Sequence, residues 1–262
     1  MVTRDTRFIF SIALISLLSL SMISYFRTPD VVEKEEVASA KDLPDFAAIG
    51  DVKTKKIAFF RYLKPFVMAN NAEILEMRRQ VEGFLDELQA KGSLSAKSLY
   101  QLQAMAVRYR IQSFSVSDES LNRLLKRLDI LPYELVLVQA ANESAWGTSR
   151  FAREGYNLFG LWCYRQGCGM VPKARNDGAV HEVARFASME EAVYAYFLNL
   201  NTHPTYKPLR DIRQAQREEQ RQINANELVS GLVGYSERGE AYVEELAAML
   251  RYNAKLFTEL TQ

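Results

Sequence analysis

The chain has 262 residues, of which 48% are apolar and 25% are charged, a composition that suits one or two globular domains with a hydrophobic core. Its formal net charge is only +1, so it lacks the strong basic bias that is typical of nucleic-acid-binding proteins. We therefore expect no nucleic-acid partner.

The first segment, residues 1–27, is predicted to be a signal anchor or transmembrane helix. Residues 8–25 are apolar and uncharged, and a run of about 18 residues is near the lower limit for a membrane span. A cleaved signal peptide is the alternative, but the one Ala-x-Ala motif, residues 38–40, lies well downstream beyond a charged segment. We favour the uncleaved anchor. Arg4 and Arg7 precede the run, so the remainder of the chain is expected to cross the membrane.

The polar, proline-containing stretch 28–53 is predicted to be a flexible tether. Apolar residues at helical spacing then begin at residue 54 and predict an N-terminal helical region over 54–115. Residues 116–262 are predicted to form a second domain. Within it, Pro132 followed by an apolar run predicts a central buried helix that ends near Ser144.

A different pattern occupies residues 160–188. Glycines and the turn sequence Asn176-Asp177-Gly178 predict a two-stranded β-hairpin, with strands over 170–175 and 180–186. Ser188 and Glu191 form a capping box that starts another helix. The charge-dense stretch 210–221 is most simply a solvated face. The predicted fold class is α+β, mostly α.

The chain has two cysteines, Cys163 and Cys168, with four residues between them. In an exported domain such a pair favours a disulfide that pins a loop, with free thiols or a metal site as alternatives. His181 and His203 do not show ligand spacing with the cysteines, so no metal site is predicted. No organic cofactor is predicted either.

The run QAANESAWG at residues 139–147 places one carboxylate, Glu143, in the last turn of the apolar helix among small residues. The negative end of the helix dipole and apolar surroundings both raise the pKa of a carboxyl group. A protonated Glu143 could therefore donate a proton to the leaving oxygen in glycoside cleavage. The alternative is a helix-end residue paired with Arg150 or Arg153.

Three neighbouring residues are open to two interpretations each. Trp146 and Phe159 could form aromatic walls for sugar rings or could belong to the core. Asn157 could hydrogen-bond a sugar or cap a turn.

Residues 139–149, together with Asn157-Leu158-Phe159-Gly160, resemble the glucosaminidase-type peptidoglycan hydrolases, glycoside hydrolase family 73. The likeness covers about residues 54–262. Further landmarks, which match one bacterial subgroup of that family, are the cysteine pair and residues 128–132, 200–204 and 234–236.

This resemblance implies a lysozyme-like fold with an α lobe and a small β-hairpin lobe. It also implies hydrolysis of the β-1,4 bond after N-acetylglucosamine in peptidoglycan glycan strands. Glu143 matches the catalytic acid, and Tyr242 matches a tyrosine that the family places near the cleft. The remaining substrate-binding candidates are Ser144, Trp146, Asn157 and Phe159.

The second catalytic group is less clear from the sequence. Some family members carry a glutamate on the β lobe, but residues 170–175 contain none. Glu182 on the return strand is the candidate for a second acid, and Asp177 more simply serves the turn. The N-acetyl group of the substrate could instead attack the anomeric carbon.

Two other functions remain as alternatives: a lytic transglycosylase, which needs no second carboxylate, and a non-catalytic wall-binding protein on the same fold. The expected partners are peptidoglycan strands and, through the N-terminal helix, the bacterial inner membrane. We expect the protein at the inner membrane facing the periplasm, or free in the periplasm if residues 1–27 are cleaved.

Overall fold

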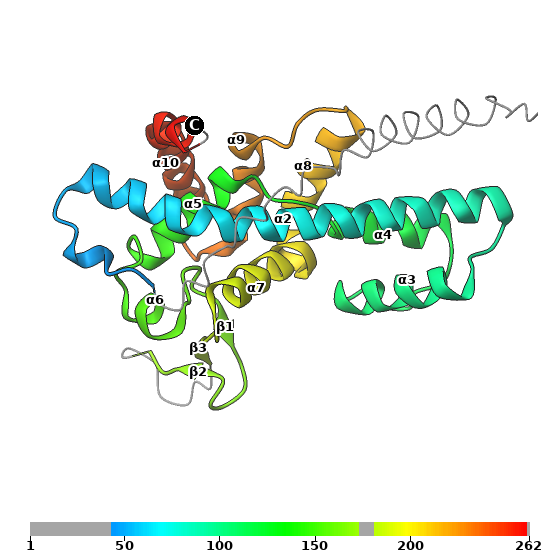
Figure 1. Cartoon of the computed structure of the whole chain (residues 1–262), viewed down its shortest axis with the longest axis horizontal. Coiled ribbons are helices and arrows are strands. Elements are labelled where there is room, and N and C mark those ends of the chain that lie inside the picture. The colour runs from blue at the N-terminus through cyan, green and yellow to red at the C-terminus, as the bar shows by residue number, and fades with distance from the viewer. Residues whose placement is uncertain (1–42, 173–180, 261–262) are drawn as a thin grey trace, which may run out of the picture. The chain divides into compact units, whose positions relative to one another are not determined.

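The computed structural model describes residues 43–172 and 181–260 (Figure 1). The α-helices are α2 (Val52–Lys91), α3 (Ala96–Arg108), α4 (Asp118–Arg127), α5 (Tyr133–Ser144), α6 (Arg150–Gly155), α7 (Met189–Thr202), α8 (Lys207–Glu218), α9 (Ala225–Leu228) and α10 (Glu240–Glu259). Short 3-10 helices are η1 (Phe46–Ala48), η2 (Pro204–Tyr206) and η3 (Val229–Tyr235), and the strands are β1 (Trp162–Cys163), β2 (Gly169–Met170) and β3 (Glu182–Ala184). This content confirms the predicted α+β, mostly α class.

The predicted signal anchor, residues 1–27, lies outside the described residues. Among the helices within the described ranges, none has the length and apolar character that a membrane crossing requires.

The segment just before residue 54 is ordered where the structure describes it. Phe46 in η1 is buried, and its ring packs edge-on against Phe59 of α2 with centroids 5.3 Å apart. Asp51 caps α2 through its Oδ1, which accepts the N–H of Thr54 at 2.8 Å. Residues 43–53, which we assigned to the tether, therefore carry a core aromatic residue and a helix cap.

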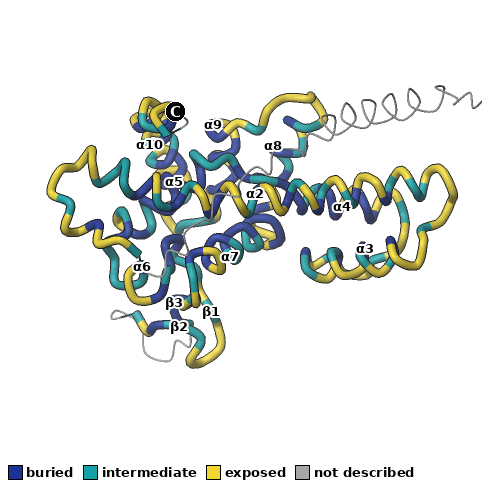
Figure 2. The backbone as a smooth tube through the Cα atoms, in the orientation of Figure 1, coloured by how far each residue is buried: buried dark blue, intermediate teal, exposed yellow. Residues whose placement is uncertain are grey.

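The long helix α2 supplies one side of the core. Gly92 ends it in the left-handed conformation, with φ of 71°. One face of α2 is buried while the other is exposed along its length (Figure 2). The buried face packs against α4, α5 and α7, so the predicted regions 54–115 and 116–262 share a core in the described part of the chain. Its buried apolar residues include Phe59, Leu63, Val67, Ile74 and Val81.

α5 is the central helix that its composition predicts. Buried residues run almost continuously from Leu135 to Ala141, because neighbours cover it on several sides. It packs against both α2 and α10. The position of its C-terminal end is therefore set by two helices far apart in the sequence.

The small sheet corrects the predicted two-stranded hairpin. Within the described residues it has three short strands in the order β1-β3-β2, all antiparallel. Trp162 pairs with Val183 and Gly169 pairs with Ala184, so β3 lies in the middle. Strands of two residues are too short to show an alternating pattern, which is why β1 was missed. The predicted turn at 176–178 lies outside the described residues.

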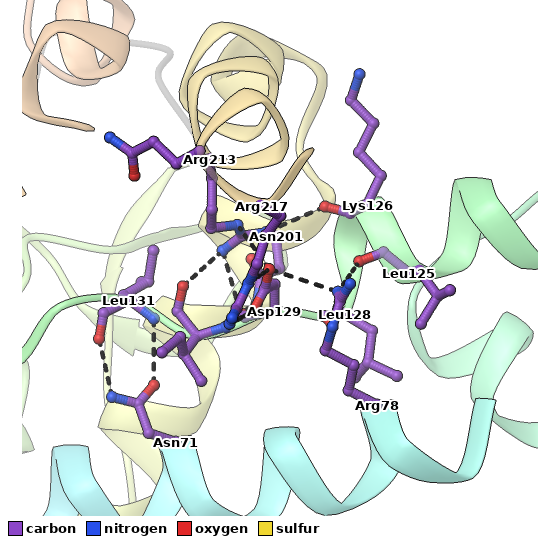
Figure 3. A network of polar contacts seen from close by, with 12 residues as sticks. Asn71, Arg78, Leu125, Lys126, Leu128, Asp129, Leu131, Asn201, Arg213 and Arg217 are labelled. Carbon is purple, nitrogen blue, oxygen red and sulfur yellow. Dashed lines mark hydrogen bonds and ion pairs between the residues drawn. The ribbon is translucent and has the colours of Figure 1, made fainter. Parts of the chain in front are cut away.

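A buried carboxylate, Asp129, ties the segment before α5 to three helices (Figure 3). Arg217 of α8 donates two hydrogen bonds to it, at 2.8 and 3.1 Å, and Arg78 of α2 lies 3.4 Å away. Asn201 of α7 donates to the Asp129 carbonyl at 3.0 Å. Burial alone would raise the pKa of Asp129, but the charges of Arg213, Arg217 and Arg78 hold it below its usual value.

The charge-dense stretch 210–221 is not simply the solvated face that we predicted. Arg210 and Arg213 are buried, with exposed fractions of 5% and 1%. Arg213 donates to carbonyls at the end of α4, including that of Lys126 at 3.1 Å, and Arg210 donates to the Leu200 carbonyl of α7 at 2.8 Å. Unpaired carbonyls at helix C-termini attract cations, and this attraction draws these side chains inward.

Candidate active site

Glu143 lies in the last turn of α5, where the chain turns away sharply. Ala145, Trp146 and Gly147 all have positive φ, of 50°, 59° and 75°. The helix ends at Ser144, as predicted, and Ala145 is its C-cap in the left-handed conformation. The N–H of Trp146 donates back to the Ala141 carbonyl at 2.8 Å, which closes the helix end.

The small residues of the motif hold this turn together. The hydroxyl of Ser144 donates to the Ala140 carbonyl at 2.6 Å and accepts the N–H of Gly147 at 2.8 Å. A Cβ on Gly147 would lie 2.6 Å from the ring of Phe46, so no larger residue fits there. Ser144 is fully buried, and its contacts give it the role of fixing the turn after Glu143.

The carboxylate of Glu143 has two different sides. Its Oε1 accepts a hydrogen bond from the hydroxyl of Tyr242 on α10 at 2.7 Å. Its Oε2 faces Gly160, where a Cβ would approach that oxygen to 3.1 Å. In the described part of the chain, Oε2 accepts no hydrogen bond. In the described residues neither Arg150 nor Arg153 pairs with this carboxylate, and Arg150 instead donates to the Val171 carbonyl at 3.0 Å.

A chain of buried hydrogen bonds supports Tyr242 from behind. The Nε2 of Gln139 donates to the Tyr242 hydroxyl at 3.0 Å, and the hydroxyl of Tyr196 donates to Gln139 Oε1 at 2.5 Å. All three side chains are almost completely buried. Because Gln139 donates to Tyr242, the tyrosine's own proton is directed toward Glu143. Gln139 was not among the predicted site residues, although it lies one helical turn before Glu143 on the same face.

Tyr235 adds an aromatic layer to the same cluster. Its ring stacks on Tyr242, with centroids 5.8 Å apart and planes 3° from parallel. Its hydroxyl donates to the Phe159 carbonyl at 2.6 Å, which anchors the loop that carries Gly160. Tyr235 and Tyr242 therefore connect the Gly160 loop to the Glu143 carboxylate.

This environment raises the pKa of Glu143 above its ordinary value. Burial is the main cause, because it disfavours the charged form. The hydrogen bond from Tyr242 and the charge of Arg238 lower the pKa, whereas the charge of Glu245 raises it. The direction agrees with the prediction from the helix end and the apolar surroundings, and it suits a group that donates a proton.

Two of the predicted substrate contacts are buried in the structure. Phe159 is fully buried and stacks on Tyr196 with ring centroids 4.1 Å apart, so it is a core residue. Asn157 is 2% exposed, and its Nδ2 donates to the carbonyls of Leu161 and Ala184 at 2.9 and 2.8 Å. Both residues support the loop that carries Gly160. Their structural interpretations, core packing and turn capping, fit these contacts.

Glu182 also hydrogen-bonds to the backbone of a neighbouring loop. It is 5% exposed rather than facing solvent. Its two oxygens accept the N–H groups of Gly167 and Gly169 at 3.0 and 2.8 Å. These bonds hold the loop closed by the predicted disulfide, Cys163–Cys168, which the structure confirms.

Glu182 and the two cysteines are grouped closely enough to suggest a metal site. The cysteine sulfurs are bonded to each other, so this group offers no thiolate ligand. Asp177, the other local carboxylate that we considered, lies outside the described residues.

Glu245 of α10 is the carboxylate that sequence reasoning missed. It follows Tyr242 by three residues, so the two lie on the same face of the helix. Arg238 pairs with it at 2.8 Å. Its charge acts on Glu143, and it lines a pocket together with Trp146, which is half-buried.

Comparison with known proteins agrees with this geometry. A family model described as Glucosaminidase, Mannosyl-glycoprotein endo-beta-N-acetylglucosaminidase, matches residues 118–255. Protein bax of Escherichia coli (strain K12) is 35% identical over 220 residues, which is 84% of this chain and 77% of that protein. No solved structure matches the chain significantly.

The matched region contains Glu143, Gly160, Tyr242 and the disulfide, and it extends over more than half of the chain. The similarity to Protein bax also confirms the bacterial subgroup that the landmarks at 128–132, 200–204 and 234–236 indicated. The chain therefore belongs to the glucosaminidase family.

Proposed function

We propose that this chain is a peptidoglycan hydrolase that cleaves the β-1,4 bond after N-acetylglucosamine, with Glu143 as the general acid. The observation that carries the proposal is the half-buried Glu143 carboxyl, whose pKa is raised and whose Oε2 lies beside Gly160 and accepts no hydrogen bond within the described residues. We expect the architecture to be lysozyme-like, with the helices as one lobe and the small sheet as the other. We also propose that the protein is exported and tethered to the inner membrane.

In this mechanism the glycosidic oxygen takes the proton from Glu143 as its bond to the anomeric carbon breaks. Tyr242 holds Oε1, so the proton lies on the other oxygen, Oε2, which faces the substrate. After the leaving sugar departs, the Glu143 carboxylate accepts a proton from the attacking water. The buried hydrogen-bond chain behind Tyr242 keeps the carboxyl oriented through both steps.

The contacts of Glu182 bear on the second catalytic group. Both of its oxygens accept backbone N–H groups, so its use as a nucleophile or base would require the disulfide loop to rearrange. This favours the route in which the carbonyl oxygen of the substrate's N-acetyl group forms a bond to the anomeric carbon while the glycosidic bond breaks. Water then opens this cyclic intermediate and leaves a reducing N-acetylglucosamine end.

The same arrangement keeps a lytic transglycosylase as the second candidate function, because that reaction also needs no second carboxylate. The two are distinguished by their products. Purified sacculi are digested with the wild-type protein, and the soluble fragments are analysed by mass spectrometry. Reducing N-acetylglucosamine ends support the hydrolase, whereas anhydro-muramic ends support the transglycosylase.

Glu143→Gln is the decisive variant, because it keeps the shape of the side chain and removes the acidic proton. We expect no product above background. Glu154→Gln is the matched control, since it makes the same change on an exposed residue of α6 and should leave activity unchanged. Full activity of Glu143→Gln would refute the proposed acid. Binding to sacculi without product from the wild type would support the wall-binding alternative.

A further inference from the structure

A pocket of about 550 Å³ lies between α2, the end of α5 and α10. Asn142 and Ala145 at the end of α5 line it, and Glu245, whose charge raises the pKa of Glu143, lines it from α10. Lys56 of α2 also lines it, although residue 56 lies before the region that the family model matches. Helix α2 therefore contributes to a pocket whose other lining residues belong to the matched region.

Lys56 is held in a defined position in this pocket. Its Nζ lies 5.0 Å from the centre of the Trp146 ring and 4.5 Å from that of Tyr252, two cation–π contacts. It also donates to Asn253 Oδ1 at 3.5 Å. In the described residues no carboxylate pairs with Lys56. The pocket thus presents an oriented ammonium whose charge has no anionic partner among those residues.

Glu245, the acidic residue among those that line the pocket, does not lie beside Lys56. Glu245 pairs with Arg238, which offsets its charge. It also precedes Tyr252 by seven residues, about 10 Å along the axis of α10. The pocket is therefore bipolar, with the paired carboxylate near Glu143 and the ammonium two helical turns away.

Of the two aromatic residues around Lys56, Tyr252 is exposed, whereas Trp146 is largely occupied by other side chains. Trp146 contacts the rings of Phe59 and Phe60, with centroids 5.7 and 5.2 Å away, and Lys56 lies over its face. Little of the indole remains for stacking on a sugar. The group that the pocket offers to a ligand is the ammonium, and ammonium groups bind carboxylates through charge-assisted hydrogen bonds.

We propose that Lys56 binds a carboxylate carried by the muramoyl residue next to the cleaved bond, either on its peptide stem or, where the stem has been removed, on its free lactyl group. This inference rests on the proposed function, since it assigns the substrate of that site. The leaving sugar in the proposed reaction is the muramoyl residue. A carboxylate bound at Lys56 would hold that sugar while Glu143 protonates its oxygen.

The test is calorimetric binding to the full chain carrying Glu143→Gln, which prevents turnover. Three ligands of equal length are used: glycan fragments with peptide stems, the same fragments after the stems are removed at the lactyl amide, and neutral chitooligosaccharide. Lys56→Met keeps the length of the side chain without its charge, and Lys56→Arg restores the charge. Lys64→Met is the matched control, because Lys64 lies over the Tyr133 ring on the same helix but outside the pocket.

We expect Lys56→Met to raise the Kd of stem-bearing fragments about 10-fold or more, the loss typical of one charge-assisted hydrogen bond. Lys56→Arg and Lys64→Met should bind these fragments as the parent does, and chitooligosaccharide binding should be unchanged throughout. A loss confined to stem-bearing fragments identifies a stem carboxylate. An equal loss on the denuded fragments shows that the lactyl carboxylate, which is free only after the stem amide is cleaved, also binds Lys56.

The proposal is overturned if Lys56→Met leaves all three affinities unchanged or lowers all three equally while its thermal unfolding matches the parent. That result, with normal glycan binding by the parent, leaves the proposed function intact. Failure of the parent to bind any of the glycans would instead count against the proposed function and the carboxylate site together.

Discussion

Gly160→Ala tests how closely the backbone must approach the proposed acid. Gly160 has φ of 65°, a left-handed conformation that costs a residue with a Cβ roughly 1–2 kcal/mol. The added Cβ would also lie 3.1 Å from Glu143 Oε2, closer than an ordinary van der Waals contact. The carboxyl group or the loop must therefore move by a few tenths of an ångström.

The effects of this movement on the reaction rate and on the pKa of Glu143 can be estimated from the geometry. A misplacement of about 1 Å in an active site can cost about 100-fold in rate, so a shift of a fraction of that should lower kcat/KM by roughly 3- to 10-fold. The methyl group also removes water from Oε2, which raises the pKa of Glu143 further. Since the protonated form is the active one, the alkaline limb of the pH–rate profile should move to higher pH.

Gly92→Ala is the matched control, because Gly92 has φ of 71° but no atom within 4 Å of the added Cβ. Both variants should lose roughly 1–2 kcal/mol of stability in denaturant titrations. Only Gly160→Ala should change kcat/KM and the pH–rate profile on a soluble glycan substrate. Equal activity and equal pH profiles for the two variants would refute the reasoning.

Three further variants follow from the charges and hydrogen bonds of the site and core. Tyr242→Phe removes a bond that lowers the pKa of Glu143, so the alkaline limb of kcat/KM should move to higher pH; an unchanged limb would contradict this role. Glu245→Gln removes a charge that raises the same pKa, so the limb should move to lower pH, and a shift in the opposite direction would exclude that influence. Asp129→Asn should lower the free energy of unfolding by about 3–5 kcal/mol near pH 7, because buried arginines lose their counter-charge. The pKa of Asp129 is lowered in the folded state, so the ionised carboxylate stabilises the fold above about pH 4, and this stabilisation fades as the pH falls through the folded-state pKa. The loss of unfolding free energy in Asp129→Asn should therefore be smaller at pH 3 than at pH 7 in chemical denaturation. A loss that is equal at both pH values would count against the charge network.

The sequence was sufficient for features that arise from nearby residues. The helix from Pro132 to Ser144, the Ser188 cap and the disulfide were all predicted, because each depends on residues within about one or two turns of chain. The charge-dense stretch 210–221 depends instead on residues that are distant in the sequence. Composition favoured a solvated face, yet Arg213 is buried because its partners lie more than eighty residues away in the sequence.

The candidate site shows the same division. The motif alone singled out Glu143, because a lone carboxylate among small residues is visible in the residues themselves, whereas Gly160 was not among the predicted site residues. Only the tertiary structure decided what each residue does: Tyr242, 99 positions away, donates to Oε1, while Glu182 and Asn157 serve the backbone instead of the cleft. Sequence determines which chemistry is available, but hydrogen bonds and burial between distant segments determine which groups remain exposed to a substrate, and those contacts form only when the helices pack.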